Sequence, residues 1–90
     1  MLQPFLSVVI PTFNEEMRIA QTLDTVADYV QSQGYSWEIV VADDGSQDRT
    51  AALVNAAARE NPHIRLVKLK HKGKGWAVKG GMMEAKGQYR

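Results

Sequence analysis

Residues 37–46 have the sequence Trp37-Glu38-Ile39-Val40-Val41-Ala42-Asp43-Asp44-Gly45-Ser46, an apolar run that ends in two adjacent carboxylates. The apolar part predicts a buried strand, and Ser46 begins a helical pattern behind it. Adjacent carboxylates at the end of a buried strand are costly, because each disfavours the ionisation of the other. Ligands bind at the carboxyl edge of open parallel sheets, so we expect Asp43 and Asp44 to face a nucleotide, a sugar or a metal.

Two other runs are predicted to be strands. Residues 5–10 are a continuous apolar run rich in β-branched side chains and stopped by Pro11, which is typical of a strand buried on both faces. Residues 64–69 alternate apolar and basic side chains, which indicates a strand buried on one face and lying near an edge of the sheet.

Three helical patterns alternate with these strands. The first follows a cap at Asn14 and stops near Gly34, the second covers residues 46–60, and the third covers residues 76–85. The order strand, helix, strand, helix, strand, helix implies a parallel sheet with right-handed crossovers. We therefore expect an α/β fold of three layers, α/β/α, with residues 1–90 forming one incomplete domain.

Composition limits the function classes. With 44% hydrophobic and 23% charged residues, the chain has the composition of an ordinary globular domain and not of a disordered segment. It has no cysteine, which excludes disulfides and thiolate metal sites. No secretion signal and no run near the roughly 18 apolar residues of a spanning helix is visible, so a cytoplasmic location is expected.

Three polar loops follow the predicted strands, at residues 11–15, 43–46 and 70–75. Parallel strands end at the same edge of a sheet, so these loops should lie together. The first loop lacks the G-x-G-x-x-G spacing of a dinucleotide site. The backbone of Pro11 and Thr12 and the side chains of Asn14 and Glu15 would instead hold a base or ribose. The alternative is that Asn14 only caps a helix and Glu15 only favours its dipole.

In the second loop, either Asp43 or Asp44 can accept a hydrogen bond from a base N–H or a ribose hydroxyl. Gly45 allows a tight turn, and Ser46 would cap the next helix. The alternative for Asp44 is a turn residue that bonds to its own backbone.

The third loop, His71-Lys72-Gly73-Lys74-Gly75, places ammonium groups on a glycine-rich backbone before a helix, which suits phosphate. It lacks the spacing of a P-loop, and a solvated lysine patch is the alternative.

Nucleic acid is not an expected partner, because acidic and basic residues nearly balance over the chain. His63 and His71 have no metal-ligand spacing, and three large side chains of the third helix are expected to be packing residues: Trp76, Met82 and Met83.

Three segments carry a resemblance to a known family: residues 7–16, 38–50 and 73–82. They resemble the nucleotide-binding half of family 2 glycosyltransferases of the GT-A fold, and among these the polyprenyl- and dolichyl-phosphate glucose or mannose synthases. The three motifs occur in the family's order and span nearly the whole chain.

The resemblance implies roles for the loop residues. The nucleoside of a sugar nucleotide maps onto Pro11, Thr12, Glu15 and Asp43, with Asp44 as support. Gly73, Lys74 and Lys79 would lie near the ribose and diphosphate. Lys79 stands where the family often has arginine, so a bidentate contact is lost there.

The resemblance also implies an inverting transfer of sugar from a nucleotide sugar such as UDP-glucose or GDP-mannose to a polyprenyl or dolichyl phosphate, with Mg²⁺ or Mn²⁺ as cofactor. The family's metal-binding D-x-D follows a further strand, of which residues 88–90 resemble the entrance. We therefore interpret the chain as an N-terminal fragment that binds nucleotide and is inactive alone, from a protein at the cytoplasmic face of the membrane.

Two other functions remain open: a non-catalytic nucleotide-binding module, and a fragment of a dinucleotide-dependent Rossmann enzyme. A strand edge left unpaired by truncation would also favour self-association.

Overall fold

The computed structural model describes residues 4–87, and the segment interpreted as the entrance to a further strand, residues 88–90, lies outside that range. Strands and helices alternate in the expected order. They are β1 (Leu6–Thr12), α1 (Ile19–Gln31), β2 (Trp37–Asp43), α2 (Thr50–Glu60), β3 (Ile64–Lys68) and α3 (Lys74–Glu84).

The three strands form one parallel sheet in the order β1-β2-β3. Every residue of β2 is buried, the carboxylates of Glu38 and Asp43 included, as its mainly apolar and β-branched sequence predicts. The register pairs Thr12 with Asp43 and Asp43 with Lys68, so the three strands end at nearly the same level. β1 is mostly half-buried and not buried on both faces as expected, because β2 is its only partner among the described strands.

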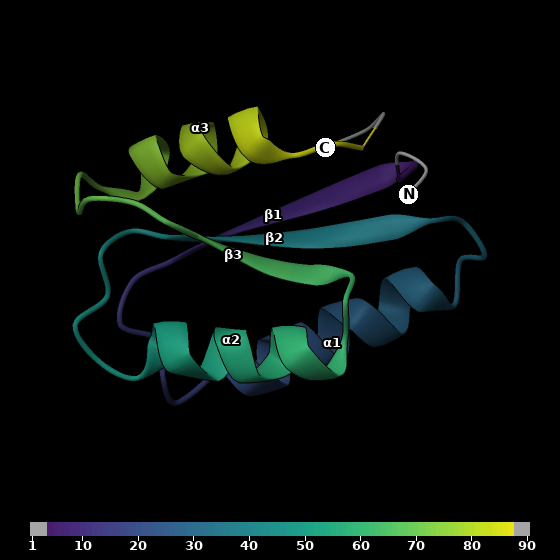
Figure 1. Ribbon diagram of the computed structural model, residues 1–90, viewed down its shortest axis with the longest axis horizontal. Coiled ribbons are helices and arrows are strands. Elements are labelled where there is room, and N and C mark those ends of the chain that lie inside the picture. The colour runs from purple at the N-terminus through teal and green to yellow at the C-terminus, as the bar shows by residue number, and fades with distance from the viewer. Residues whose placement is uncertain (1–3, 88–90) are drawn as a thin grey trace.

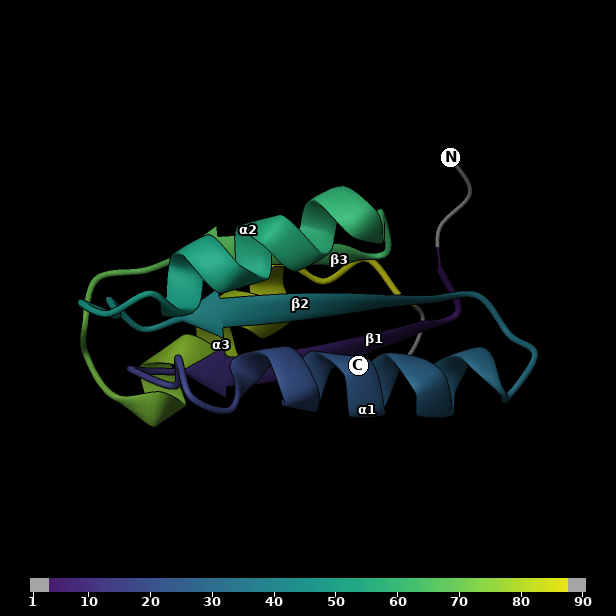
Figure 2. The same cartoon turned by 90° about the horizontal axis from the view of Figure 1, so that it is seen from below.

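The helices form a layer on each face of the sheet. α1 and α2 cover one face and α3 covers the other (Figures 1 and 2). The main core lies between the sheet and the α1/α2 layer, where Leu23, Ile39, Val41 and Val54 are at most 1% exposed. The prediction of a three-layer α/β/α fold is confirmed.

α3 packs on the sheet through small residues. Ala77 is fully buried, a Cβ on Gly81 would collide with Val9, and a Cβ on Gly80 would lie 2.7 Å from Leu69. The large side chains expected to pack there do not: Trp76 is 42% and Met83 75% exposed. Small residues face the sheet because a close approach of helix and sheet leaves no space for larger ones.

A buried carboxylate fastens the far end of α3 to the sheet. Glu38 accepts hydrogen bonds from the Ser7 hydroxyl (2.5 Å), the Lys86 backbone N–H (2.6 Å) and the Arg65 Nε–H (3.1 Å). The Gly87 N–H donates to Ser7 Oγ at 2.7 Å. Burial raises the pKa of Glu38, but the hydrogen bonds and the positive charge of Arg65 outweigh it, and the pKa is lowered. The residues that follow α3 are thus fixed to the first two strands.

Candidate functional site

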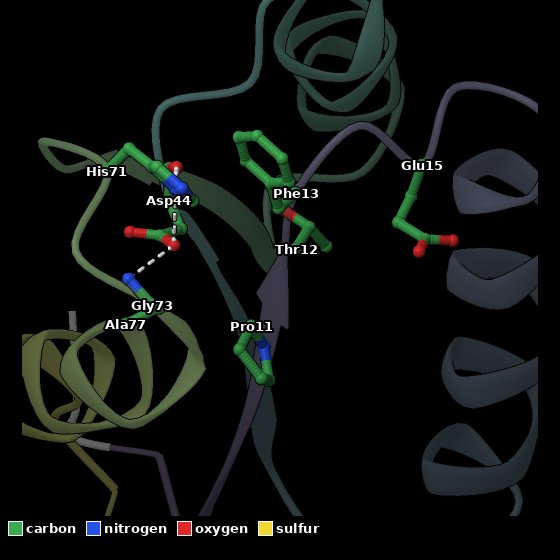
Figure 3. A pocket seen from close by; sticks show the side chains of 8 residues that line it. All are labelled: Pro11, Thr12, Phe13, Glu15, Asp44, His71, Gly73 and Ala77. Carbon is green, nitrogen blue, oxygen red and sulfur yellow. Dashed lines mark hydrogen bonds and ion pairs between the residues drawn. The ribbon is translucent and has the colours of Figure 1, made fainter.

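The loops that follow β1, β2 and β3 lie together at the carboxyl edge of the sheet and enclose a cavity of about 350 Å³ (Figure 3). It is lined by Pro11, Thr12, Phe13, Glu15, Asp44, His71, Gly73 and Ala77. Of the eight residues predicted for the site whose side chains the structure describes, five line it, and they come from all three loops.

Asn14 braces the first loop against the second and is not the cap of α1, which begins five residues later. Its backbone has a positive φ of 52°, its N–H donates to Ser46 Oγ (2.9 Å), and its Oδ1 accepts from the Gln47 N–H (2.9 Å). Asparagine tolerates this left-handed conformation better than most residues. Asn14 shapes the cavity wall from behind and is not among its lining residues.

Glu15 lines the cavity from the start of the turn before α1. Its backbone N–H donates to Thr50 Oγ1 at 2.8 Å, and its side chain lies 2.8 Å from Arg18 Nη2. The carboxylate remains partly exposed and can still accept hydrogen bonds from a ligand.

Asp43 is fully buried and directed into the protein. Its carboxylate accepts hydrogen bonds from Thr12 Oγ1 (3.3 Å), from the Ser46 N–H (3.2 Å) and from the Ser46 hydroxyl. Ser46 therefore does not cap α2 as predicted: that helix begins at Thr50, whose N–H donates to Asp48 at 2.9 Å. In this structure Asp43 joins the first two loops and is not among the residues that line the cavity.

Asp44 lines the cavity and holds the third loop. Its carboxylate accepts from the backbone N–H groups of Lys72 (2.8 Å) and Gly73 (2.9 Å) and lies 2.9 Å from His71 Nδ1. Burial opposes the charge, but the two N–H groups and His71 outweigh it, so the pKa of Asp44 lies below its ordinary value. The cost of the adjacent carboxylates is thus offset by separate sets of donors for Asp43 and Asp44.

Gly45 lets the second and third loops touch. Its φ is +75°, and a Cβ at this position would lie 2.9 Å from the backbone nitrogen of His71. The turn requires glycine both for its conformation and for this close approach.

Sequence reasoning missed the aromatic wall of the cavity. The rings of Phe13 and His71 stack with centroids 4.2 Å apart, and Phe13 is 39% exposed. The only sequence signal was a phenylalanine in a polar loop directly after a strand. A flat exposed ring at a cavity wall is suited to contact a planar base.

The three residues predicted to lie near the diphosphate differ in their position relative to the cavity. Gly73, at φ +101°, lines the cavity one residue before α3, and Lys74 is the first residue of that helix. Lys79 is exposed on α3 and is not a lining residue.

No cluster of three or more potential metal ligands occurs among residues 4–87. The oxygens of Asp44 already accept from three donors, so these residues do not fit a divalent cation as they stand. Within the same residues, no helix has the length and apolar character to cross a membrane. The site combines hydrogen-bond acceptors, the exposed aromatic ring of Phe13 and the N-terminus of α3. These groups together can bind a polar, planar ligand.

Comparison with known proteins gives three kinds of match. The profile of glycosyl transferase family 2 matches residues 7–89. Dolichyl-phosphate beta-glucosyltransferases are 40% identical in Dictyostelium discoideum and 38% identical in Saccharomyces cerevisiae, each over 94% of this chain and 28% of the relative. A mannosyltransferase of Pyrobaculum calidifontis, solved in complex with GDP-Man and Mn²⁺, superposes with a TM-score of 0.77 at 30% identity, over 94% of this chain and 25% of that one. The chain thus spans 25–28% of the length of these three relatives.

Proposed function

The chain belongs to glycosyl transferase family 2, and on that premise we propose that it binds the nucleotide of a sugar-nucleotide donor in the cavity at the carboxyl edge of the sheet. In the complete protein, this donor would supply sugar to a polyprenyl or dolichyl phosphate. The names of the dolichyl-phosphate beta-glucosyltransferases support this acceptor, and the GDP-Man complex of the mannosyltransferase supports a nucleotide-sugar donor.

The cavity carries the proposal. It joins one loop from each strand, and its walls combine the exposed ring of Phe13 with acceptors on Thr12, Glu15 and Asp44. A nucleoside needs these features, because a base has a flat apolar face and a polar edge, and a ribose has vicinal hydroxyls. We place the base against Phe13 and the ribose toward Glu15 and Asp44. Asp43 becomes a direct contact only if its carboxylate turns away from Ser46.

The diphosphate would lie at the start of α3. The backbone N–H groups of a helix N-terminus and the ammonium group of a lysine both attract phosphate oxygens. Gly73 and Lys74 occupy that position. Lys79 would reach the diphosphate only from the outer side of α3. Mg²⁺ or Mn²⁺ would neutralise the leaving diphosphate in the complete protein, and we assign none of its ligands to residues 4–87.

Nucleotide binding and sugar transfer can be measured separately, and the test measures each of them. We expect isothermal titration calorimetry to show weak binding of UDP or GDP to residues 1–90, little changed by Mn²⁺, and we expect no sugar transfer by this chain alone. Tight binding that depends strongly on Mn²⁺ would contradict the proposal. NAD titrated in parallel tests the dinucleotide alternative, and binding of NAD alone would favour it.

Transfer itself is tested in the complete protein. With a polyprenyl phosphate acceptor and a radiolabelled nucleotide sugar, label should appear in the lipid phase. Nucleotide binding without any transfer would instead favour the non-catalytic module.

We place the complete protein at the cytoplasmic face of the membrane. Association of the 90-residue chain through an exposed strand edge is a separate proposal, tested by sedimentation velocity at increasing concentration.

A further inference from the structure

Charge is distributed very unevenly along the chain. Residues 1–67 contain nine acidic and four basic side chains, whereas residues 68–90 contain seven basic and one acidic. The described part of the basic segment includes the end of β3, the third loop and α3. The end of β3 and the third loop lie at the carboxyl edge of the sheet, and α3 lies on the face opposite α1 (Figure 1). The net charge of +1 therefore hides a strongly cationic region.

The large apolar side chains of α3 face away from the sheet, where only water would surround them. Its sheet-facing residues are Ala77, Gly80 and Gly81. Trp76 and Met83 are seven residues apart, which is two helical turns, so they lie on one face, and both are exposed. Exposed apolar groups gathered on one face mark interaction sites more often than scattered ones do.

Lysines lie beside these apolar groups. Lys72 Nζ is 4.5 Å from the centre of the Trp76 ring, and Lys79 is exposed one turn further along α3. The four residues Lys72, Trp76, Lys79 and Met83 form a surface, here called the α3 outer face, that combines positive charge with an indole and a thioether. Figure 1 shows no described helix or strand on the side of α3 that faces away from the sheet.

We propose that the α3 outer face binds the surface of an anionic lipid bilayer. Lysines are attracted to anionic headgroups, and indole rings favour the boundary between headgroups and acyl chains. An RNA partner would call for arginines or stacked aromatic residues, and this face has one aromatic ring, already in contact with Lys72. The proposal goes beyond nucleotide binding and is measured without any nucleotide.

The α3 outer face lies close to the cavity, because the same helix contributes to both. Gly73 and Ala77 line the cavity and belong to the start of α3 or adjoin it. A bilayer against the outer face would therefore be separated from the cavity by α3 alone, and a lipid-borne phosphate would reach the cavity past the start of that helix.

The test is co-sedimentation of the full 90-residue chain with vesicles of phosphatidylcholine, with or without phosphatidylserine. Binding is expected only with phosphatidylserine. Lys79→Gln should weaken it about fivefold, the effect of one lysine near an anionic surface, and Met83→Ser should weaken it severalfold. The matched controls are Arg59→Gln on α2 and Met17→Ser before α1, both exposed on the other side of the sheet, and neither should change binding.

Tryptophan fluorescence provides a second readout, because Trp37 is buried at 7% exposure and Trp76 is not. Vesicles with phosphatidylserine should shift the emission to shorter wavelength, and Trp76→Phe should abolish the shift. The proposal is overturned by binding that ignores phosphatidylserine or by equal losses in the controls. It is also overturned if soluble heparin binds as tightly as the vesicles and Met83→Ser has no effect, which would indicate a general polyanion surface.

Discussion

The carboxylate of Asp44 holds the backbone of Gly73, with Asp44 Oδ2 2.9 Å from the Gly73 nitrogen (Figure 3). These residues are 29 positions apart: Asp44 begins the loop after β2, and Gly73 is the last residue before α3. The contact sets the start of α3 against the end of β2, so one side chain both forms part of the acidic wall of the cavity and fixes the position of its third loop.

Asp44→Asn should therefore weaken nucleotide binding more than Asp43→Asn does. An amide in place of Asp44 loses charge-assisted hydrogen bonds to three donors and changes the cavity wall, whereas Asp43 lies behind it. Calorimetry with UDP and GDP compares the two variants after circular dichroism has checked their folding. The reverse order, which follows from the role the family resemblance implies for Asp43, would mean that Asp43 turns toward the ligand.

Phe13→Leu should lower the affinity for a nucleoside by about 1–3 kcal/mol, the usual value of one base stacked on an aromatic ring. Phe5→Leu is the matched control, because Phe5 is exposed to a similar degree (40% against 39%) but contacts Tyr35. Equal affinities in the two variants would remove Phe13 from the proposed base contact.

Lys74→Ala should reduce affinity for a nucleoside diphosphate and leave affinity for the bare nucleoside nearly unchanged, because only a phosphate contact is lost. Salt should imitate the substitution, since the Debye length falls from ~10 Å at 0.1 M to ~3 Å at 1 M. Titrations of both ligands at two salt concentrations measure this, with Arg59→Ala as control. Equal losses for the two ligands would make Lys74 a structural residue.

Gly45→Ala should destabilise the domain more than Gly34→Ala. Both glycines have positive φ (75° and 80°), so both substitutions carry a strain of roughly 1–2 kcal/mol. Only the Cβ at position 45 meets a neighbour, the backbone nitrogen of His71 at 2.9 Å, whereas nothing lies within 4 Å at position 34. The difference in unfolding free energy in urea thus reports the contact between the second and third loops, and no difference would refute it.

Stability should fall on acidification, and Glu38 should contribute to that fall. Its folded pKa is lowered, so the stabilisation is present above the ordinary glutamate pKa of about 4.3 and is lost as pH drops through the folded pKa. Glu38→Gln should cost about 1.5–3 kcal/mol at neutral pH and much less in acid. Urea unfolding at several pH values measures both. Asp44 and Asp48 also have lowered pKa values, so part of the acid dependence should remain in the variant.

Local pattern determined the order of elements in this protein. Residues 37–42 are apolar except for Glu38 and rich in β-branched side chains, which predicted the buried strand β2, and the apolar periodicity of residues 19–30 matches α1. Once strands and helices alternate, the rules of parallel sheets bring the three loops to one edge, and the cavity is found there. Helix starts were less well predicted: Asn14 and Ser46 have the side chains of caps but serve contacts between loops.

Only the tertiary structure decided which residues of those loops meet. Asp43 and Asp44 are equivalent in local sequence, yet one accepts from Thr12 and Ser46 and the other from the third loop. The stack of Phe13 on His71 joins loops after different strands, and no local propensity contains it. The physical reason is that hydrophobic periodicity reports the burial pattern within a window of about 11–18 residues. Contacts between residues near 30 positions apart instead depend on strand register and on donors that the rest of the chain brings to each carboxylate.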